Sequence, residues 1–268
     1  MLFRSVASAP SALVVSEWPL FLLLGTGMLV PYAGWFAFCR ARGRPTAEAA
    51  VQALTVGLPN YVAAGLPIIA ALYGTRGTVL IAVSIAAGTT LPSPITLLIL
   101  ELGTAQGDRS RGALVGRALR RALTKPIVLA PFIGLAFSLA GLHPSDLVRR
   151  SLDLLGEASG GVALFVTGLV LSAQRLRLNG HVLLALAVGL FLRPALTLAV
   201  ARLASVPWDT TQVALLMNAL PSGFFGILFA ISYGRPSAEA GSIVLASTVA
   251  SAATLAVVIA AGFPHAAP

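Results

Sequence analysis

The sequence predicts an all-α polytopic membrane protein. The chain has 268 residues and a mean hydropathy of +0.90, and 57% of its residues are hydrophobic while only 10% are charged. Soluble domains carry about 25% charged residues, so this chain has too little polar surface to coat a soluble globule. Several apolar runs of about 20 residues are each long enough to cross the hydrocarbon core of a bilayer as a helix.

Eight spans are expected along the chain. They cover residues 18–39, 47–73, 77–101, 124–142, 152–172, 180–204, 209–233 and 237–262. The first contains no charged residue from Trp18 to Cys39. The 47–73 and 209–233 spans are rich in proline and glycine, so both are predicted to be broken helices.

The positions of the arginines predict the orientation in the membrane. If loops alternate between sides, one side receives Arg40, Arg42, Arg44, the 109–125 loop, Arg175, Arg177 and Arg235. The other side receives Arg4, Arg76, Arg149, Arg150 and Arg202. The positive-inside rule makes the first side cytoplasmic, which places both termini outside the inner membrane. The net charge of +9 reflects this bias, and no nucleic-acid partner is expected.

The chain divides into two unequal halves. Residues 1–101 hold three spans, residues 102–123 form a basic cytoplasmic linker, and residues 124–268 hold five spans. The last three spans correspond in each half: an unbroken span, a Leu-Pro segment, and a span rich in glycine, serine and threonine. Because three is odd, the two copies run in opposite directions, which predicts an inverted-topology repeat. The chain thus has eight spans of a ten-helix, five-plus-five template.

The paired Leu-Pro segments predict the functional site. Pro67 removes a backbone donor inside a span, and such a break persists only where protein or a wet cavity satisfies the freed groups. Paired interrupted segments in two halves are the sequence sign of a transporter's substrate site. The substrate-binding candidates are Asn60, Tyr61, Pro67, Arg193, Asn218, Pro221, Ser222 and Gly223, and the helix-crossing candidates are Gly65, Pro67 and Gly226. The alternative is that proline and glycine only kink and pack membrane helices.

Arg193 is the only charged residue near the middle of a span. A guanidinium at that depth is expected to face a cavity or a partner, and the carboxylate of a substrate is a fitting one. The alternative is that the side chain snorkels to an interface. The carboxylates fall at span ends or in loops, so no buried proton relay is visible. No enzyme motif, cofactor motif or metal-ligand spacing is present, so neither an enzyme nor a cofactor is predicted.

The segment from Leu54 to Tyr61, continued by Gly65–Ile68 and by Tyr73-Gly74, resembles the fourth helix of the auxin efflux carrier family. The likeness is nearest to the malonate-transporter-like bacterial branch. It continues through Phe165–Ala173 and Arg193–Ala195 to Gly223–Gly226, in order along the chain.

The resemblance implies a ten-helix secondary carrier in which a mobile bundle, here 18–101 with 180–262, moves against a scaffold that includes 124–172. It implies transport of a small organic anion, a dicarboxylate such as malonate, by alternating access, and it implies a homodimer. By that template the chain begins near the end of the second helix. The alternative is a truncated or non-transporting membrane protein, or a subunit whose partner supplies the missing N-terminal helices.

Overall fold

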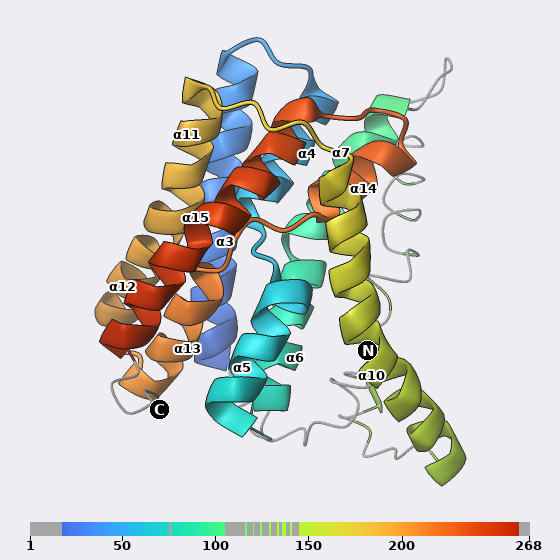
Figure 1. Ribbon diagram of the computed structural model, residues 1–268, viewed down its shortest axis with the longest axis vertical. Coiled ribbons are helices and arrows are strands. Elements are labelled where there is room, and N and C mark those ends of the chain that lie inside the picture. The colour runs from blue at the N-terminus through green and yellow to red at the C-terminus, as the bar shows by residue number, and fades with distance from the viewer. Residues whose placement is uncertain are drawn as a thin grey trace.

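The computed structural model describes residues 18–74, 77–104 and 145–262, together with isolated residues between 116 and 140. Within these ranges the regular elements are helices, apart from one isolated β-bridge. The chain is an all-helical bundle (Figure 1). The expected 124–142 span and nearly all of the 102–123 linker lie outside the described ranges.

The first set of helices is formed by residues 18–104. In chain order it contains α3 (Trp18–Ala41), α4 (Thr46–Gly57), the π-helical turn η1 (Tyr61–Gly65), α5 (Leu66–Tyr73), α6 (Gly77–Thr90) and α7 (Pro92–Thr104). In Figure 1, α3 runs upward, α4 and α5 run downward, and α6 and α7 run upward again.

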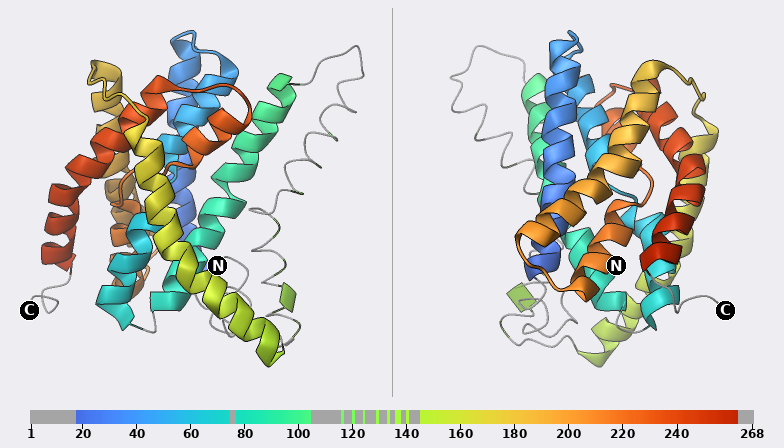
Figure 2. Two further views of the ribbon diagram at one scale, coloured as in Figure 1. Left: turned by 45° about the vertical axis from the view of Figure 1, so that its right-hand side comes forward. Right: turned by 90° about the vertical axis from the view of Figure 1, so that its left-hand side faces the viewer.

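The second set follows the long helix α10 (Asp146–Ser172). It contains α11 (Gly180–Ala187), the π-helical turn η3 (Val188–Leu192), α12 (Arg193–Leu203), α13 (Trp208–Asn218), α14 (Phe225–Ser232) and α15 (Ala238–Gly262). Here α11 and α12 run downward, α13 and α14 run upward, and α15 runs downward (Figures 1 and 2). The second set therefore runs in the opposite direction to the first.

Four continuous helical stretches among the described residues are long and apolar enough to cross a membrane. They are Trp18–Ala41, Leu80–Gly103, Gly180–Leu203 and Ala238–Gly262. Two further expected spans, 47–73 and 209–233, are each divided into two shorter helices. The expected 152–172 span begins earlier, because α10 starts at Asp146.

The core of the bundle lies where the two sets of helices meet. Leu20, Leu23, Leu24 and Met28 form a fully buried stripe on α3 at the i, i+3, i+4 spacing of a helix face. This helix contacts α4 in the first set and α12 and α13 in the second. In contrast, α10 leans away from the bundle and touches it mainly at η1 and α15 (Figure 2).

The break in the first broken helix is not at Pro67. The backbone leaves the helix at Leu58–Asn60 and is helical again from Tyr61 to Tyr73. Pro67 lies at the start of α5, directly after η1, and the helix continues through it because the wider π turn accommodates a residue without a backbone N–H. The expectation that Pro67 opens the helix was therefore wrong in its position, and Pro59 lies in the break instead.

Candidate functional site

The two helix breaks cross in the middle of the bundle and are joined through their backbones. Pro59 and Ser222 form an isolated antiparallel bridge. The Asn60 N–H donates to the Pro221 carbonyl at 2.9 Å, and the Gly223 N–H donates to the Leu58 carbonyl at 2.8 Å. Each break therefore satisfies polar backbone groups that the other leaves free, which is what an interruption at membrane depth requires.

Two glycines allow this close approach. A β-carbon on Gly223 would lie 2.9 Å from the Leu58 carbonyl oxygen and 3.2 Å from that of Pro59. One on Gly226 would lie 2.7 Å from the Val51 carbonyl oxygen. A side chain at either position would push the two broken helices apart.

Polar side chains satisfy the remaining backbone groups at the breaks. Asn60 caps η1, because its Oδ1 accepts from the Ala63 N–H at 3.1 Å. The guanidinium of Arg193 donates from Nε to the Gly189 carbonyl at 2.6 Å and from Nη2 to the Leu220 carbonyl at 2.7 Å. Asn60 and Arg193 thus each support the helix break on their own side of the crossing.

Four polar atoms at the crossing are buried and have no hydrogen-bond partner. They belong to four of the residues predicted from the sequence: Tyr61 (hydroxyl), Arg193 (Nη1), Asn218 (Oδ1) and Ser222 (Oγ). All four residues are at most 3% exposed. Buried polar groups are normally paired, because an unpaired one costs about 1–3 kcal/mol. Four such atoms in one part of the fold make the crossing the candidate functional site.

Two of these four residues flank one point. A β-carbon on Gly189 would lie 3.5 Å from Arg193 Nη2 and 3.6 Å from Ser222 Oγ. Tyr61 begins η1 directly after Asn60, whose N–H bonds to the Pro221 carbonyl at the crossing. The two π-helical turns, one from each set of helices, therefore contribute to the same place, and π turns are frequent at functional sites.

Asn218 is oriented by a chain of hydrogen bonds. Thr197 Oγ1 donates to the Arg193 carbonyl at 2.9 Å, so it accepts from Asn218 Nδ2 at 2.8 Å. The same nitrogen lies 3.4 Å from the Leu23 carbonyl. This arrangement fixes the amide with Oδ1 as a free acceptor.

The other predicted residues lie in different surroundings. Pro221 contributes its carbonyl to the crossing, and Gly65 lies against the Leu220 side chain. Pro67 is exposed on the surface of α5. Sequence reasoning missed Gly189 and Thr197, although both stand at helical spacing from Arg193, four residues before it and four after it.

A second polar cluster closes the end of the bundle that carries Arg40, Arg42, Arg44, Arg175, Arg177 and Arg235, which we call the arginine-rich end. Four side-chain bonds link the first set of helices to the second at this end. They are Arg44–Glu239 at 3.0 Å, Ser237–Glu48 at 3.0 Å, His181–Gln52 at 2.6 Å and Tyr233–Glu101 at 2.6 Å. Cys39 lies under the cluster and donates weakly from Sγ to Gln52 Oε1 at 3.5 Å.

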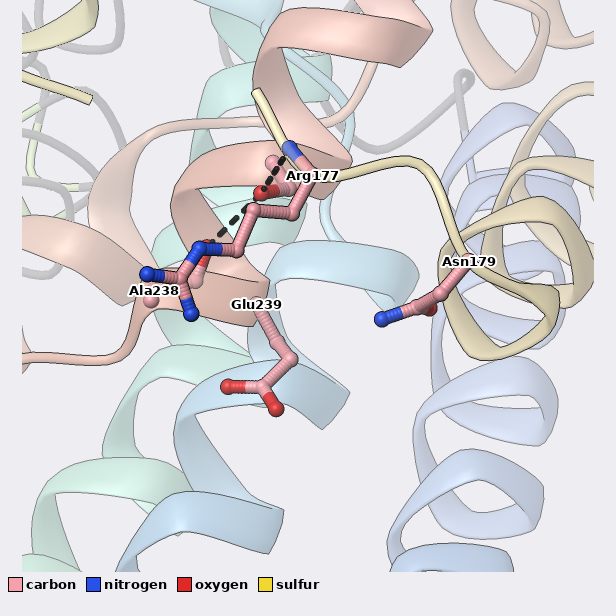
Figure 3. Close-up of a pocket in the computed structure, with 5 residues that line it drawn as sticks. Arg177, Asn179, Ala238 and Glu239 are labelled. Carbon is pink, nitrogen blue, oxygen red and sulfur yellow. Dashed lines mark hydrogen bonds between the residues drawn. The ribbon is translucent and has the colours of Figure 1, made fainter. Parts of the chain in front are cut away.

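A small pocket adjoins this cluster. It is lined by Arg177, Asn179, Ala238, Glu239 and Ser242 (Figure 3). Ser242 Oγ accepts from the Arg177 N–H at 3.1 Å and donates to the Ala238 carbonyl at 3.0 Å, which ties the chain before α11 to α15. The cavity volume of about 70 Å³ is well below the 300–1,000 Å³ of ordinary ligand sites. Its polar groups have a structural role.

The fold and its central crossing define a membrane transport protein. Residues 1–259 match the family model described as "Membrane transport protein". The chain therefore belongs to this family, the auxin efflux carrier family, as its sequence resemblance indicated. The family is described as one of membrane transport proteins.

Similar proteins come from bacteria and plants. The chain is 28% identical over 202 residues to the uncharacterized transporter YfdV of Escherichia coli strain K12, covering 74% of this chain and 63% of YfdV. It is 27% identical over 158 residues to a putative malonate transporter of Rhizobium meliloti, covering 58% of this chain and 49% of that protein. It is 23% identical over 246 residues to auxin efflux carrier component 8 of Arabidopsis thaliana, covering 74% of this chain and 67% of that protein. The chain thus spans less than two thirds of the two bacterial relatives.

Proposed function

We propose that this protein is a secondary carrier that moves a small organic anion across the inner membrane by alternating access. The observation that supports this most directly is the set of four unpaired, buried polar atoms at the crossing of the two broken helices. A substrate with hydrogen-bonding atoms completes them when it binds. Arg193 supplies positive charge there, which suits an anion.

The direction of the helices supports an inverted-repeat transporter. α3, the α4–α5 pair and the α6–α7 pair correspond to α11–α12, the α13–α14 pair and α15, and the two sets run in opposite directions (Figure 1). Substrate sites in such folds lie near the bilayer midplane, where discontinuous helices meet. The positive-inside rule makes the arginine-rich end cytoplasmic in this proposal.

Alternating access requires the mobile bundle to move as a body against the scaffold. The Arg44–Glu239 and Ser237–Glu48 bonds hold the N-terminus of α15 against α4 and the loop before it. Both sets of helices belong to the mobile bundle in this proposal, so these bonds keep its arginine-rich end together while it moves.

α10 belongs to the scaffold in the same proposal. Among the described helices, its main contacts are with η1 and α15, and this small contact area allows the bundle to move against it. Its outward face carries exposed apolar side chains such as Leu154 and Phe165, as a lipid-facing or dimer-forming helix does.

Malonate is the substrate to test first, because one relative is described as a putative malonate transporter. The experiment is uptake of radiolabelled malonate into proteoliposomes that contain the purified chain. Ser222→Ala removes an unpaired hydroxyl and is expected to abolish most uptake without destabilising the fold. Ser84→Ala is the matched control, since the Ser84 hydroxyl is equally buried but bonds to the Leu80 carbonyl of its own helix.

The outcome separates the carrier from the alternative of a non-transporting membrane protein or subunit. Uptake that survives Ser84→Ala and is lost in Ser222→Ala supports a carrier with its site at the crossing. Equal uptake by both variants would place the substrate elsewhere. A chain that inserts normally but transports neither malonate nor other carboxylates, alone or extended by upstream residues, would favour the non-transporting alternative.

A further inference from the structure

The hydrogen bonds of Arg193 limit what its charge can hold. Arginine presents five N–H donors. Nε is used by the Gly189 carbonyl and Nη2 by the Leu220 carbonyl, while Nη1 has no partner. Two of the five donors are therefore used, and both N–H groups of Nη1 and one of Nη2 are left for a ligand.

The polar side chains that accompany these free donors at the crossing are neutral. The Ser222 hydroxyl, which has no partner, lies with Arg193 Nη2 beside Gly189, and the unpaired Tyr61 hydroxyl belongs to the same crossing. Among the described residues, the buried charged side chains are Arg193 and Glu101, and Glu101 lies at the arginine-rich end with Tyr233. The site built by the described residues thus carries one positive charge.

We propose that the site selects the singly charged form of a carboxylate substrate, either a monocarboxylate or a dicarboxylate that carries one proton. This inference rests on the proposed carrier function. One carboxylate is neutralised by Arg193, whereas a second, ionised carboxylate would be buried without a cationic partner, which is strongly unfavourable. A protonated carboxyl or an amide in that position can exchange hydrogen bonds with the Tyr61 and Ser222 hydroxyls.

Gly189 provides the room for the bound group and is a specificity-determining residue in this proposal. It lies in the π turn η3, beside both Arg193 and Ser222. A methyl group added at Gly189 would meet its neighbours at 3.5–3.9 Å, which is ordinary contact. Alanine therefore fits the fold but occupies the space next to the guanidinium and the Ser222 hydroxyl.

The test compares two ligands of nearly equal shape and different charge. Binding of malonate and of malonamate, its half-amide with one carboxylate, is measured by calorimetry on the purified chain in nanodiscs. At about pH 8, where both malonate carboxyls are ionised, malonamate is expected to bind at least about tenfold more tightly. Malonate affinity is expected to rise about tenfold for each pH unit of acidification towards its second pKa, because one proton is bound with it. Malonamate affinity should stay constant over that range.

The variants Gly189→Ala and Gly34→Ala complete the experiment. Gly34 is an exposed helical glycine whose added methyl would meet nothing within 4 Å, so Gly34→Ala should bind both ligands as the native chain does. Gly189→Ala should unfold at a similar temperature and bind both ligands about tenfold more weakly. Equal binding by the two variants would overturn the assignment of the space beside Gly189.

Two further outcomes distinguish this inference from the function on which it rests. Malonate that binds as tightly as malonamate at about pH 8, without pH dependence, would overturn the charge selection and leave the carrier intact. Failure of malonate, malonamate, acetate and benzoate all to bind would overturn the anion site, and the carrier proposal would fall with it.

Discussion

Gly223→Ala tests the closeness of the helix crossing. The added methyl would lie 2.9 Å from the Leu58 carbonyl oxygen, whereas ordinary contacts of a β-carbon begin at 3.4 Å. The partner backbone must therefore retreat by about 0.5 Å, and it is the same carbonyl that accepts the Gly223 N–H at 2.8 Å. Gly223 does not have a positive φ, so the effect is steric and not conformational.

The expected cost follows from these contacts. Overpacking of a tight interior costs about 1–3 kcal/mol. A weakened backbone hydrogen bond adds up to about 1 kcal/mol. For a chain of this size, each kcal/mol corresponds to about 2–4 °C in the unfolding temperature. Gly223→Ala should therefore lower the apparent unfolding temperature by roughly 2–16 °C, and malonate uptake should fall with it.

The assay is thermal unfolding of the purified protein in detergent, followed by circular dichroism at one scan rate because unfolding of such proteins is often irreversible. Gly34→Ala is the control, since its methyl meets nothing and alanine favours the helix. If Gly223→Ala unfolded at the same temperature as Gly34→Ala, Gly223 would not lie in close contact with the Leu58 carbonyl.

Three further changes probe other parts of the site and the arginine-rich end. Asn60→Ala removes the cap of η1 and should destabilise the protein by about 1 kcal/mol, measured as a lower unfolding temperature. Asn60→Asp keeps a capping oxygen, so it should retain most of that stability. Arg193→Lys should lose most malonate uptake at normal membrane insertion, because one ammonium cannot hold the Gly189 and Leu220 carbonyls and a ligand in the same geometry; full uptake would contradict the role given to the guanidinium. Arg44→Ala breaks the half-exposed ion pair with Glu239, worth about 0.2–1 kcal/mol, so alkylation of the chain's single cysteine beneath it should become about two- to fivefold faster. An unchanged rate would show that this ion pair does not hold the arginine-rich end together.

Much of the architecture could be predicted from the sequence because hydropathy and helix length are local properties. The ends of α3, of the Gly180–Leu203 stretch and of α15 fall within two residues of the expected spans 18–39, 180–204 and 237–262. The hydroxyls of Thr89 and Thr90 bond to carbonyls of their own helix, as their spacing allows. The family could likewise be identified from short motifs.

The place of the first break could not be predicted in the same way. Both Pro59 and Pro67 can interrupt a helix, and the sequence does not distinguish them. The distinction is tertiary: the Leu58 and Asn60 backbone finds partners in Gly223 and Pro221 of the other broken helix, while the missing N–H of Pro67 is accommodated by the wider turn η1 directly before α5. A break forms where another segment can satisfy it.

The sequence by itself determined that this protein crosses a membrane, that two matching segments interrupt its helices, and that one arginine lies at mid-span. Only the tertiary structure decided that two nitrogens of Arg193 donate to backbone carbonyls while the third, Nη1, has no partner. It also decided that Gly189, which no motif singled out, lies between that guanidinium and Ser222. The physical reason is that hydrophobic burial is a property of each segment, whereas the satisfaction of a buried polar atom depends on which distant segments meet it.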